Sequence, residues 1–291
     1  MSIWFLCRKT PKIPGANSNG FAFALHPLQK MSPGRLPSRG RESVESFPSA
    51  GAPHGATRRE TIMKKNLTEL VFVIDRSGSM GGLEPDTIGG FNATLEQHRQ
   101  ADGEAIVSTV LFDHETIVLH DRVDIDKVQP MTEADYQVRG MTALLDAVGG
   151  SIRHIERVQS YLPEDFRAEH VIFVITTDGY ENASRKYSYD QVRHMIEMKK
   201  ETGWEFLFLG ANIDAVSEAA RIGISADRAA TYMADGIGNH VMYEAVADAT
   251  CAMRSMPAGS PKMTGSWKAS IDRDVATRGK KSAKKRGLFN R

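Results

Sequence analysis

The sequence has few of the features that mark extracellular or membrane-spanning chains. It contains only two cysteines, Cys7 and Cys251, which lie near opposite ends in dissimilar surroundings and predict no disulfide framework. No apolar run approaches the roughly 20 residues that span a bilayer. The opening apolar stretch, residues 3–7, is too short for the core of a secretory signal. We therefore expect a cytoplasmic protein.

Charge is distributed unevenly, although the formal net charge of the 291 residues is only +1. Residues 1–62 have a net charge of +6 and residues 262–291 one of +8, which leaves −13 for the residues between them. An acidic body repels phosphates, and this argues against nucleic-acid binding by the globular part. The basic C-terminal segment leaves that possibility open, and a solvated flexible tail is the simpler interpretation.

The ends of the chain differ in composition from its middle. Residues 1–62 hold seven of the twelve prolines and show no sustained apolar periodicity, so we expect a disordered extension. Their composition also resembles that of an organelle transit peptide, and a third interpretation is that translation starts at Met63. We expect a folded domain over residues 63–255 and a basic, flexible tail over residues 256–291.

Buried strands and amphipathic helices alternate after residue 66. Continuous apolar runs rich in β-branched residues predict strands over residues 70–74, 106–112, 171–175 and 206–209. Apolar residues three and four positions apart predict helices that begin near Ile88, Leu144, Val192, Ile213 and Ile237. A further strand, residues 116–119, follows the second after only three residues, so these two must be antiparallel. The pattern predicts a doubly wound, mostly parallel α/β sheet with one antiparallel edge strand and helices on both faces.

A candidate cation site follows the first predicted strand, which runs directly into Asp75-Arg76-Ser77-Gly78-Ser79. In an open parallel sheet, ligands bind at the carboxyl ends of the strands, where this loop lies. A carboxylate followed at alternate positions by two hydroxyls offers only oxygen ligands, which suit a hard cation such as Mg²⁺. Glycines around the motif let the backbone turn tightly enough for the three side chains to converge.

The pattern Asp-x-Ser-x-Ser after a buried first strand resembles the metal-ion-dependent adhesion site (MIDAS) of the von Willebrand factor A (VWA, integrin I-like) family. That family also has a threonine on a second loop and an aspartate after a later strand. By this resemblance Thr142, which precedes a long amphipathic helix, and Asp178, which follows the strand at residues 171–175, complete the site. One departure is Met141, where many relatives have a second glycine before the threonine.

The resemblance implies a Rossmann-like VWA fold and a bound Mg²⁺ or Mn²⁺. It implies that Ser77, Ser79 and in some members Thr142 contact the ion directly, whereas Asp75 and Asp178 act largely through water. It also implies a stand-alone domain that captures an acidic side chain of a partner protein, because neutral ligands leave the ion electrophilic. We expect no catalytic residue, no organic cofactor and no membrane partner.

Other functions and other residues stay open on the sequence. A metal-dependent phosphohydrolase could use Asp75, but it would need a general acid/base and a phosphate-binding cation, and only Arg76 and Arg139 are near. The domain could also be an assembly or chaperone subunit of a larger ATPase-containing complex. A nucleotide-binding loop and a serine hydrolase are disfavoured, because neither a P-loop lysine nor a plausible catalytic base accompanies the glycines.

Three polar residues lie near the predicted ligands along the chain. Asp146 follows Thr142 by four residues, and a position in solvent or behind the ligands is favoured over direct ligation. Glu181 and Asn182 could border the metal, although an ordinary polar loop is the simpler interpretation. Asp75 itself could merely cap a helix or brace its loop.

Overall fold

The structure, a computed structural model, describes residues 67–257 and 263–289. The predictions for residues 1–62, including a start at Met63, lie outside the described residues. Within the described ranges, no helix is both long enough and apolar enough to cross a membrane.

In the described part of the chain, six strands form a single sheet in the order β3-β2-β1-β4-β5-β6. All neighbouring strands are parallel except β2 and β3, which pair antiparallel at one edge. The predicted fold class, with its antiparallel edge strand, is therefore confirmed. The strands are β1 (Thr68–Asp75), β2 (Ala105–Phe112), β3 (Thr116–Asp124), β4 (His170–Thr177), β5 (Glu205–Ala211) and β6 (Ala229–Tyr232).

The order of the strands creates a reversal point between β1 and β4. From β1 the chain moves outward to β2 and β3, then returns to β4 on the other side and continues to β5 and β6. Connections that leave the two central strands in opposite directions open a crevice at their carboxyl ends, which is where open α/β sheets bind ligands. Every residue of β1 is buried, so Asp75 at its end is held on a rigid element.

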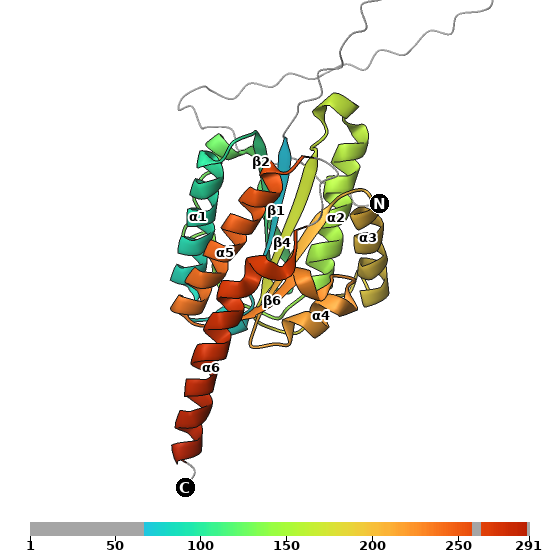
Figure 1. The fold of residues 1–291 in the computed structure, drawn as a ribbon. Coiled ribbons are helices and arrows are strands. Elements are labelled where there is room, and N and C mark those ends of the chain that lie inside the picture. Colours follow the sequence, from blue (N-terminus) through green and yellow to red (C-terminus); the bar gives the residue numbers. More distant parts are fainter. Residues whose placement is uncertain (1–66, 258–262, 290–291) are drawn as a thin grey trace, which may run out of the picture. The chain divides into compact units, whose positions relative to one another are not determined.

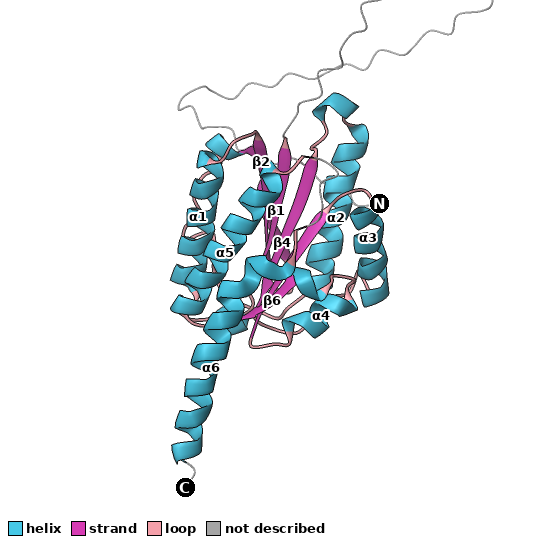
Figure 2. Cartoon of the chain, in the orientation of Figure 1, coloured by secondary structure: helices cyan, strands magenta, loops and turns pink. Residues whose placement is uncertain are grey.

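Helices cover both faces of the sheet (Figures 1 and 2). Residues of α1 and α5 share one apolar core with one face, and residues of α2, α3 and α4 share a second core with the other. The helices are α1 (Glu84–Gln100), α2 (Leu144–Tyr161), α3 (Tyr189–Glu201), α4 (Ala215–Arg221), α5 (Gly236–Ser255) and α6 (Ala269–Phe289). The five helices predicted from apolar spacing correspond to α1 through α5.

Helices α1 and α5 approach each other closely at Gly90. A Cβ atom at this position would lie 2.2 Å from Cδ2 of Tyr243 on α5, so the ring of Tyr243 fits only against a residue without a side chain. A buried polar contact joins the same two helices further along, because His98 Nε2 lies 2.9 Å from Thr250 Oγ1. Helices α1 and α5 thus form one closely packed layer on their face of the sheet.

Two elements differ from the sequence prediction. Strand β6 has the composition Ala-Ala-Thr-Tyr, which contains no apolar run, and it forms through its pairing with β5. The prediction of a flexible tail over residues 256–291 is wrong for the segment that includes the 3₁₀ turn Gly265–Lys268 and the first half of α6. Trp267 Nε1 donates to the carbonyl of Asp227 at 2.8 Å, and Ile271 is buried. Because the segment contains so few apolar residues, its composition is that of a solvated tail and did not indicate this packing.

Candidate metal centre

Asp75 is the most firmly held residue of the predicted site. Its side chain is fully buried at the end of β1. Oδ1 accepts the backbone N–H of Ser77 at 2.7 Å, and Oδ2 accepts the hydroxyl of Thr177 at 2.6 Å. The phenol of Tyr136 donates to the carbonyl of Asp75 at 2.5 Å. The carboxylate is therefore fixed from the loop after β1 and from the end of β4.

Ser77, Ser79 and Asp178 form a continuous chain of oxygen atoms. The hydroxyls of Ser77 and Ser79 lie 3.1 Å apart across the short 3₁₀ turn Gly78–Met80. The hydroxyl of Ser79 donates to Oδ1 of Asp178 at 2.5 Å, across 99 positions of sequence. The loops after β1 and β4 thus meet where the two central strands end.

Thr142 reaches the same place from a third loop. Its backbone N–H donates to Oδ1 of Asn182 at 2.9 Å, and its carbonyl accepts the N–H of Asn182 at 3.0 Å. A Cβ atom built on Gly179 would lie 3.2 Å from Thr142 Oγ1 and 3.4 Å from Ser79 Oγ. Gly179 therefore leaves open the space toward which these two hydroxyls converge.

The chemistry of the cluster fits a divalent cation. Oδ2 of Asp178 is buried and has no hydrogen-bond partner among the described residues. Burial raises the pKa of Asp75 to about 6 and also raises the pKa of Asp178 above its ordinary value. No lysine, arginine or histidine within residues 67–257 and 263–279 forms an ion pair with either carboxylate. Two buried carboxylates beside three hydroxyls have the oxygen atoms, the charge and the space that Mg²⁺ or Mn²⁺ requires.

The three neighbouring polar residues support the loops. Glu181 accepts the N–H of Leu145 at 2.9 Å and thereby caps the first turn of α2. Asp146 accepts the backbone N–H groups of residues 185, 186 and 187 at 2.8–3.0 Å. Asn182 holds the backbone of Thr142, as described above. These hydrogen bonds to the backbone agree with the simpler interpretation of the sequence, in which the three residues belong to polar loops and do not bind the metal directly.

A second carboxylate cluster, which the sequence analysis missed, lies at the same end of the sheet. Asp113, fully buried after β2, accepts Nε of Arg139 at 2.9 Å, and its Oδ2 lies 2.9 Å from Nη2 of Arg76. Glu115 pairs with Nη2 of Arg139 at 2.7 Å, and Nδ1 of His114 lies 3.2 Å from Asp113. The sequence signal was a three-residue connection that contains two acids, together with one arginine inside the motif, Arg76, and one shortly before Thr142, Arg139.

This second cluster, called here the arginine cluster, braces the loop that carries Thr142. The N–H of Ala143 donates to the carbonyl of Asp113 at 2.8 Å, and the N–H of Arg139 donates to that of Arg76 at 2.9 Å. Gly140 has a positive φ of 70°, and a Cβ there would lie 2.2 Å from Nδ1 of His114. Asp113, His114 and Glu115 could approach one cation together, but two arginines already neutralise the acids.

No family model matches the sequence, and comparison with curated proteins finds no match. Solved structures resemble the chain at low sequence identity. The vWF domain of the type V pili tip protein Mfa5 from Porphyromonas gingivalis is 10% identical, with a TM-score of 0.48 over 69% of this chain and 99% of that one. A von Willebrand factor type A structure from Catenulispora acidiphila is 15% identical, with a TM-score of 0.45 over 64% and 43%.

A third similar structure is that of proximal thread matrix protein 1 from the mussel byssus with a zinc-occupied MIDAS motif. It is 18% identical, with a TM-score of 0.45 over 65% of this chain. This chain spans only 47% of the length of that protein. Two of these structures bear the name of the family that the Asp75-x-Ser77-x-Ser79 motif resembles.

Proposed function

We propose that this chain is a metal-ion-dependent protein-binding domain. In this proposal a divalent cation, Mg²⁺ or Mn²⁺, is held by five residues on three loops, namely Asp75, Ser77, Ser79, Thr142 and Asp178. The observation that supports it most strongly is the pair of buried carboxylates beside converging hydroxyls, with no ion-pairing cation among the described residues. Leaving two such carboxylates uncompensated is costly, and a bound cation removes that cost.

The residues of the site have separate tasks in this proposal. Asp75 is fixed by Thr177 and by the N–H of Ser77, so it can orient the loop and supply charge to the ion through water. Ser77 and Ser79 are neutral oxygen ligands, and they leave the ion electrophilic. When bound, the cation supplies the positive charge that attracts a carboxylate from outside. A partner with an exposed Asp or Glu side chain could then occupy a remaining coordination position.

Exposed apolar side chains beside the site suit a protein partner. Met141, next to Thr142, is 53% exposed, and Tyr180, two residues after Asp178, is also 53% exposed. Aromatic residues and methionine are enriched in protein interfaces, where they surround the contacts that fix orientation. An ion flanked by Met141 and Tyr180 would therefore offer both a specific contact and apolar surface.

A metal-dependent pull-down tests the proposal. The full chain would be immobilised, exposed to a lysate with Mg²⁺ or with EDTA, and compared with its Asp75→Ala variant. The proposal predicts a set of partners that is lost with EDTA and with Asp75→Ala. As a matched control, Asp190→Ala removes an exposed carboxylate from the first turn of α3 and should retain the partners. Partners that survive both EDTA and Asp75→Ala, in a protein with an unchanged circular dichroism spectrum, would contradict the proposal.

The phosphohydrolase alternative gains no support from the geometry. Asp75 is fully buried and both of its oxygens accept hydrogen bonds, so it is not placed for attack on a substrate. Arg76 and Arg139 lie beside Asp113, and neither forms an ion pair with Asp75 or Asp178. A phosphatase assay with Mg²⁺ should show no turnover that Asp75→Asn abolishes. A role as an assembly or chaperone subunit, and a cytoplasmic location, remain predictions.

A further inference from the structure

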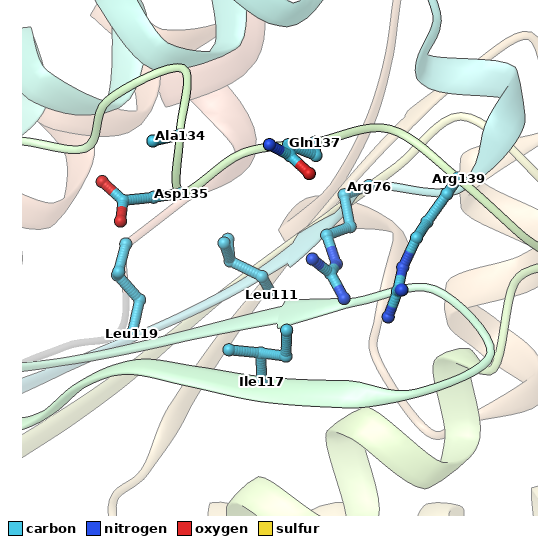
Figure 3. Close-up of a pocket in the computed structure, with 8 residues that line it drawn as sticks. All are labelled: Arg76, Leu111, Ile117, Leu119, Ala134, Asp135, Gln137 and Arg139. Carbon is cyan, nitrogen blue, oxygen red and sulfur yellow. The ribbon is translucent and has the colours of Figure 1, made fainter.

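A cavity of about 340 Å³ lies between the β2–β3 pair and the loop that leads to Thr142 (Figure 3). Its floor is apolar, because Leu111, Ile117 and Leu119 rise from the two strands. The other lining residues are Arg76, Ala134, Asp135, Gln137 and Arg139. Small-molecule sites have volumes of about 300–1,000 Å³, so the cavity has the size of a small one. Four of its eight lining residues are charged or polar, so it would suit a ligand that has both a polar and an apolar part.

One polar group in this cavity lacks a partner. Arg76 is only 4% exposed, yet its buried Nε has no hydrogen-bond partner among the described residues. Its Nη2 lies near Asp113 at 2.9 Å but outside hydrogen-bond geometry. Figure 3 shows the guanidinium directed into the space above Ile117, beside Arg139. A buried donor without an acceptor is costly, so this position favours an oxygen atom supplied by a ligand.

The charges around Arg76 indicate which kind of oxygen-bearing group the cavity would bind. Arg76 and Arg139 share the single buried carboxylate of Asp113. Glu115, the other acidic partner of Arg139, is 63% exposed, so water screens its charge. Arg139 is also 49% exposed, and the buried charges of Arg76 and Asp113 balance. Arg76 and Arg139 line the cavity, whereas Asp113 and Glu115 do not, so two guanidinium groups face this end of it. At the opposite end, Asp135 already accepts the N–H and the hydroxyl of Thr132 through Oδ2.

We propose that this cavity binds a carboxylate attached to a branched aliphatic body. The carboxylate lies against the guanidinium groups of Arg76 and Arg139, and the aliphatic body packs on Leu111, Ile117 and Leu119. The volume has room for about ten waters, which is enough for an acid of about eight non-hydrogen atoms. Such a group can be a free acid or the C-terminal end of a peptide. The proposed ligand does not bind through the metal ion. The backbone of Arg76 belongs to the loop with Asp75 and Ser77, but its guanidinium lies beside Asp113, with Nη2 at 2.9 Å from Oδ2.

The direct test follows the arginine side-chain N–H signals of the full-length ¹⁵N-labelled protein by NMR. The probe is 4-methylpentanoate, and EDTA is present so that no carboxylate can bind through a metal ion. The proposal predicts a saturable shift of the Arg76 Nε–H signal, assigned with Arg76→Gln. The uncharged 4-methylpentanamide should bind roughly tenfold more weakly or worse, because a charge-assisted hydrogen bond is lost. Acetate should also bind more weakly, because it has no body to cover the apolar floor.

Two matched variants test the apolar floor without disturbing Arg76. Ile117 and Val118 are neighbours on β3 and are similarly exposed, at 43% and 44%, but only Ile117 lines the cavity. Successive side chains of a strand point to opposite faces, so Val118 lies on the other face of the sheet. Ile117→Ser should weaken the binding of 4-methylpentanoate about threefold to tenfold, and Val118→Ser should leave it unchanged.

Three results would overturn the proposal. They are the absence of any saturable shift with 4-methylpentanoate, equal binding of the acid and its amide, and equal effects of Ile117→Ser and Val118→Ser. A further arm with N-acetyl-L-leucine distinguishes the two sources of the carboxylate. Tighter binding of this probe identifies a peptide C-terminus, and tighter binding of 4-methylpentanoate identifies a free acid; each supports the proposed chemistry.

Discussion

Two carboxylate clusters lie at the same end of the sheet, one built on Asp75 and Asp178 and the other on Asp113 and Glu115. The first has hydroxyls around it and no ion-pairing cation among the described residues, whereas the second is neutralised by two arginines. The comparison teaches that grouped acids alone do not identify a metal site. What distinguishes the proposed metal centre is that the described chain supplies no cation of its own.

The largest expected effect separates the clusters by stability. Asp113→Asn leaves Arg76 with a buried charge that has lost its counterion, and breaking a buried pair in this way costs roughly 3–5 kcal/mol. Urea unfolding of the metal-free protein measures the loss. In the same assay Asp178→Asn should leave the stability unchanged or raise it, because it removes a buried carboxylate that lacks a cation. Equal destabilisation by the two variants would contradict the proposal that only the Asp113 cluster is neutralised by arginines.

The next effect separates the clusters by metal affinity. Asp178→Asn should weaken the binding of Mn²⁺ by roughly ten- to a hundredfold, because the site loses charge and a group that orients Ser79. Isothermal titration calorimetry measures the dissociation constants. Glu115→Gln, which changes the arginine cluster at an exposed position, is the matched control and should retain the wild-type affinity. If the affinity fell with Glu115→Gln but not with Asp178→Asn, the metal would bind at the arginine cluster, and the proposed site would be wrong.

The ease with which each cluster could be predicted from the sequence also differs. Asp75, Ser77 and Ser79 are close together along the chain, so their spacing after a buried strand was sufficient to predict a cation site. Thr142 and Asp178 were added to that prediction only through the resemblance to the VWA family. The arginine cluster joins arginines to acids that are 24 or more positions away, and no local pattern encodes that pairing. For the same reason β6 could not be predicted from the sequence, because it has no apolar run and depends on pairing with its neighbour β5.

Acidity should act on the metal centre in a defined pH range. Burial raises the pKa of Asp75 to about 6, and the cation requires the ionised form, so protons compete with the metal below that pH. Mn²⁺ affinity should be nearly constant above pH 7 and fall by up to about tenfold per pH unit below pH 6. In the metal-free protein, acidity has the opposite effect, because it stabilises the folded state. The folded pKa exceeds the unfolded value of about 4, so Asp75 destabilises the fold as pH rises from about 4 to about 6. Constant affinity from pH 7.5 to pH 5 would contradict this account.

The smallest expected effect concerns two glycines, one in each cluster. Gly179→Ala would place a methyl group 3.2 Å from Thr142 Oγ1 and should reduce Mn²⁺ affinity a few-fold while the fold is retained. Gly140→Ala would instead collide with His114 at a positive φ, so it should lower the unfolding midpoint more than Gly179→Ala does. Calorimetry and thermal unfolding of both variants give the two readouts. The reverse order in stability would show that the arginine cluster does not brace the loop.

The position of a bound ion tests the central claim most directly. Crystals of the full chain grown with Mn²⁺ would be measured at a wavelength where manganese scatters anomalously. The account predicts an anomalous peak among the side-chain oxygens of Ser77, Ser79 and Thr142. No peak there at saturating Mn²⁺, or a peak at Asp113 and Glu115 instead, would contradict it.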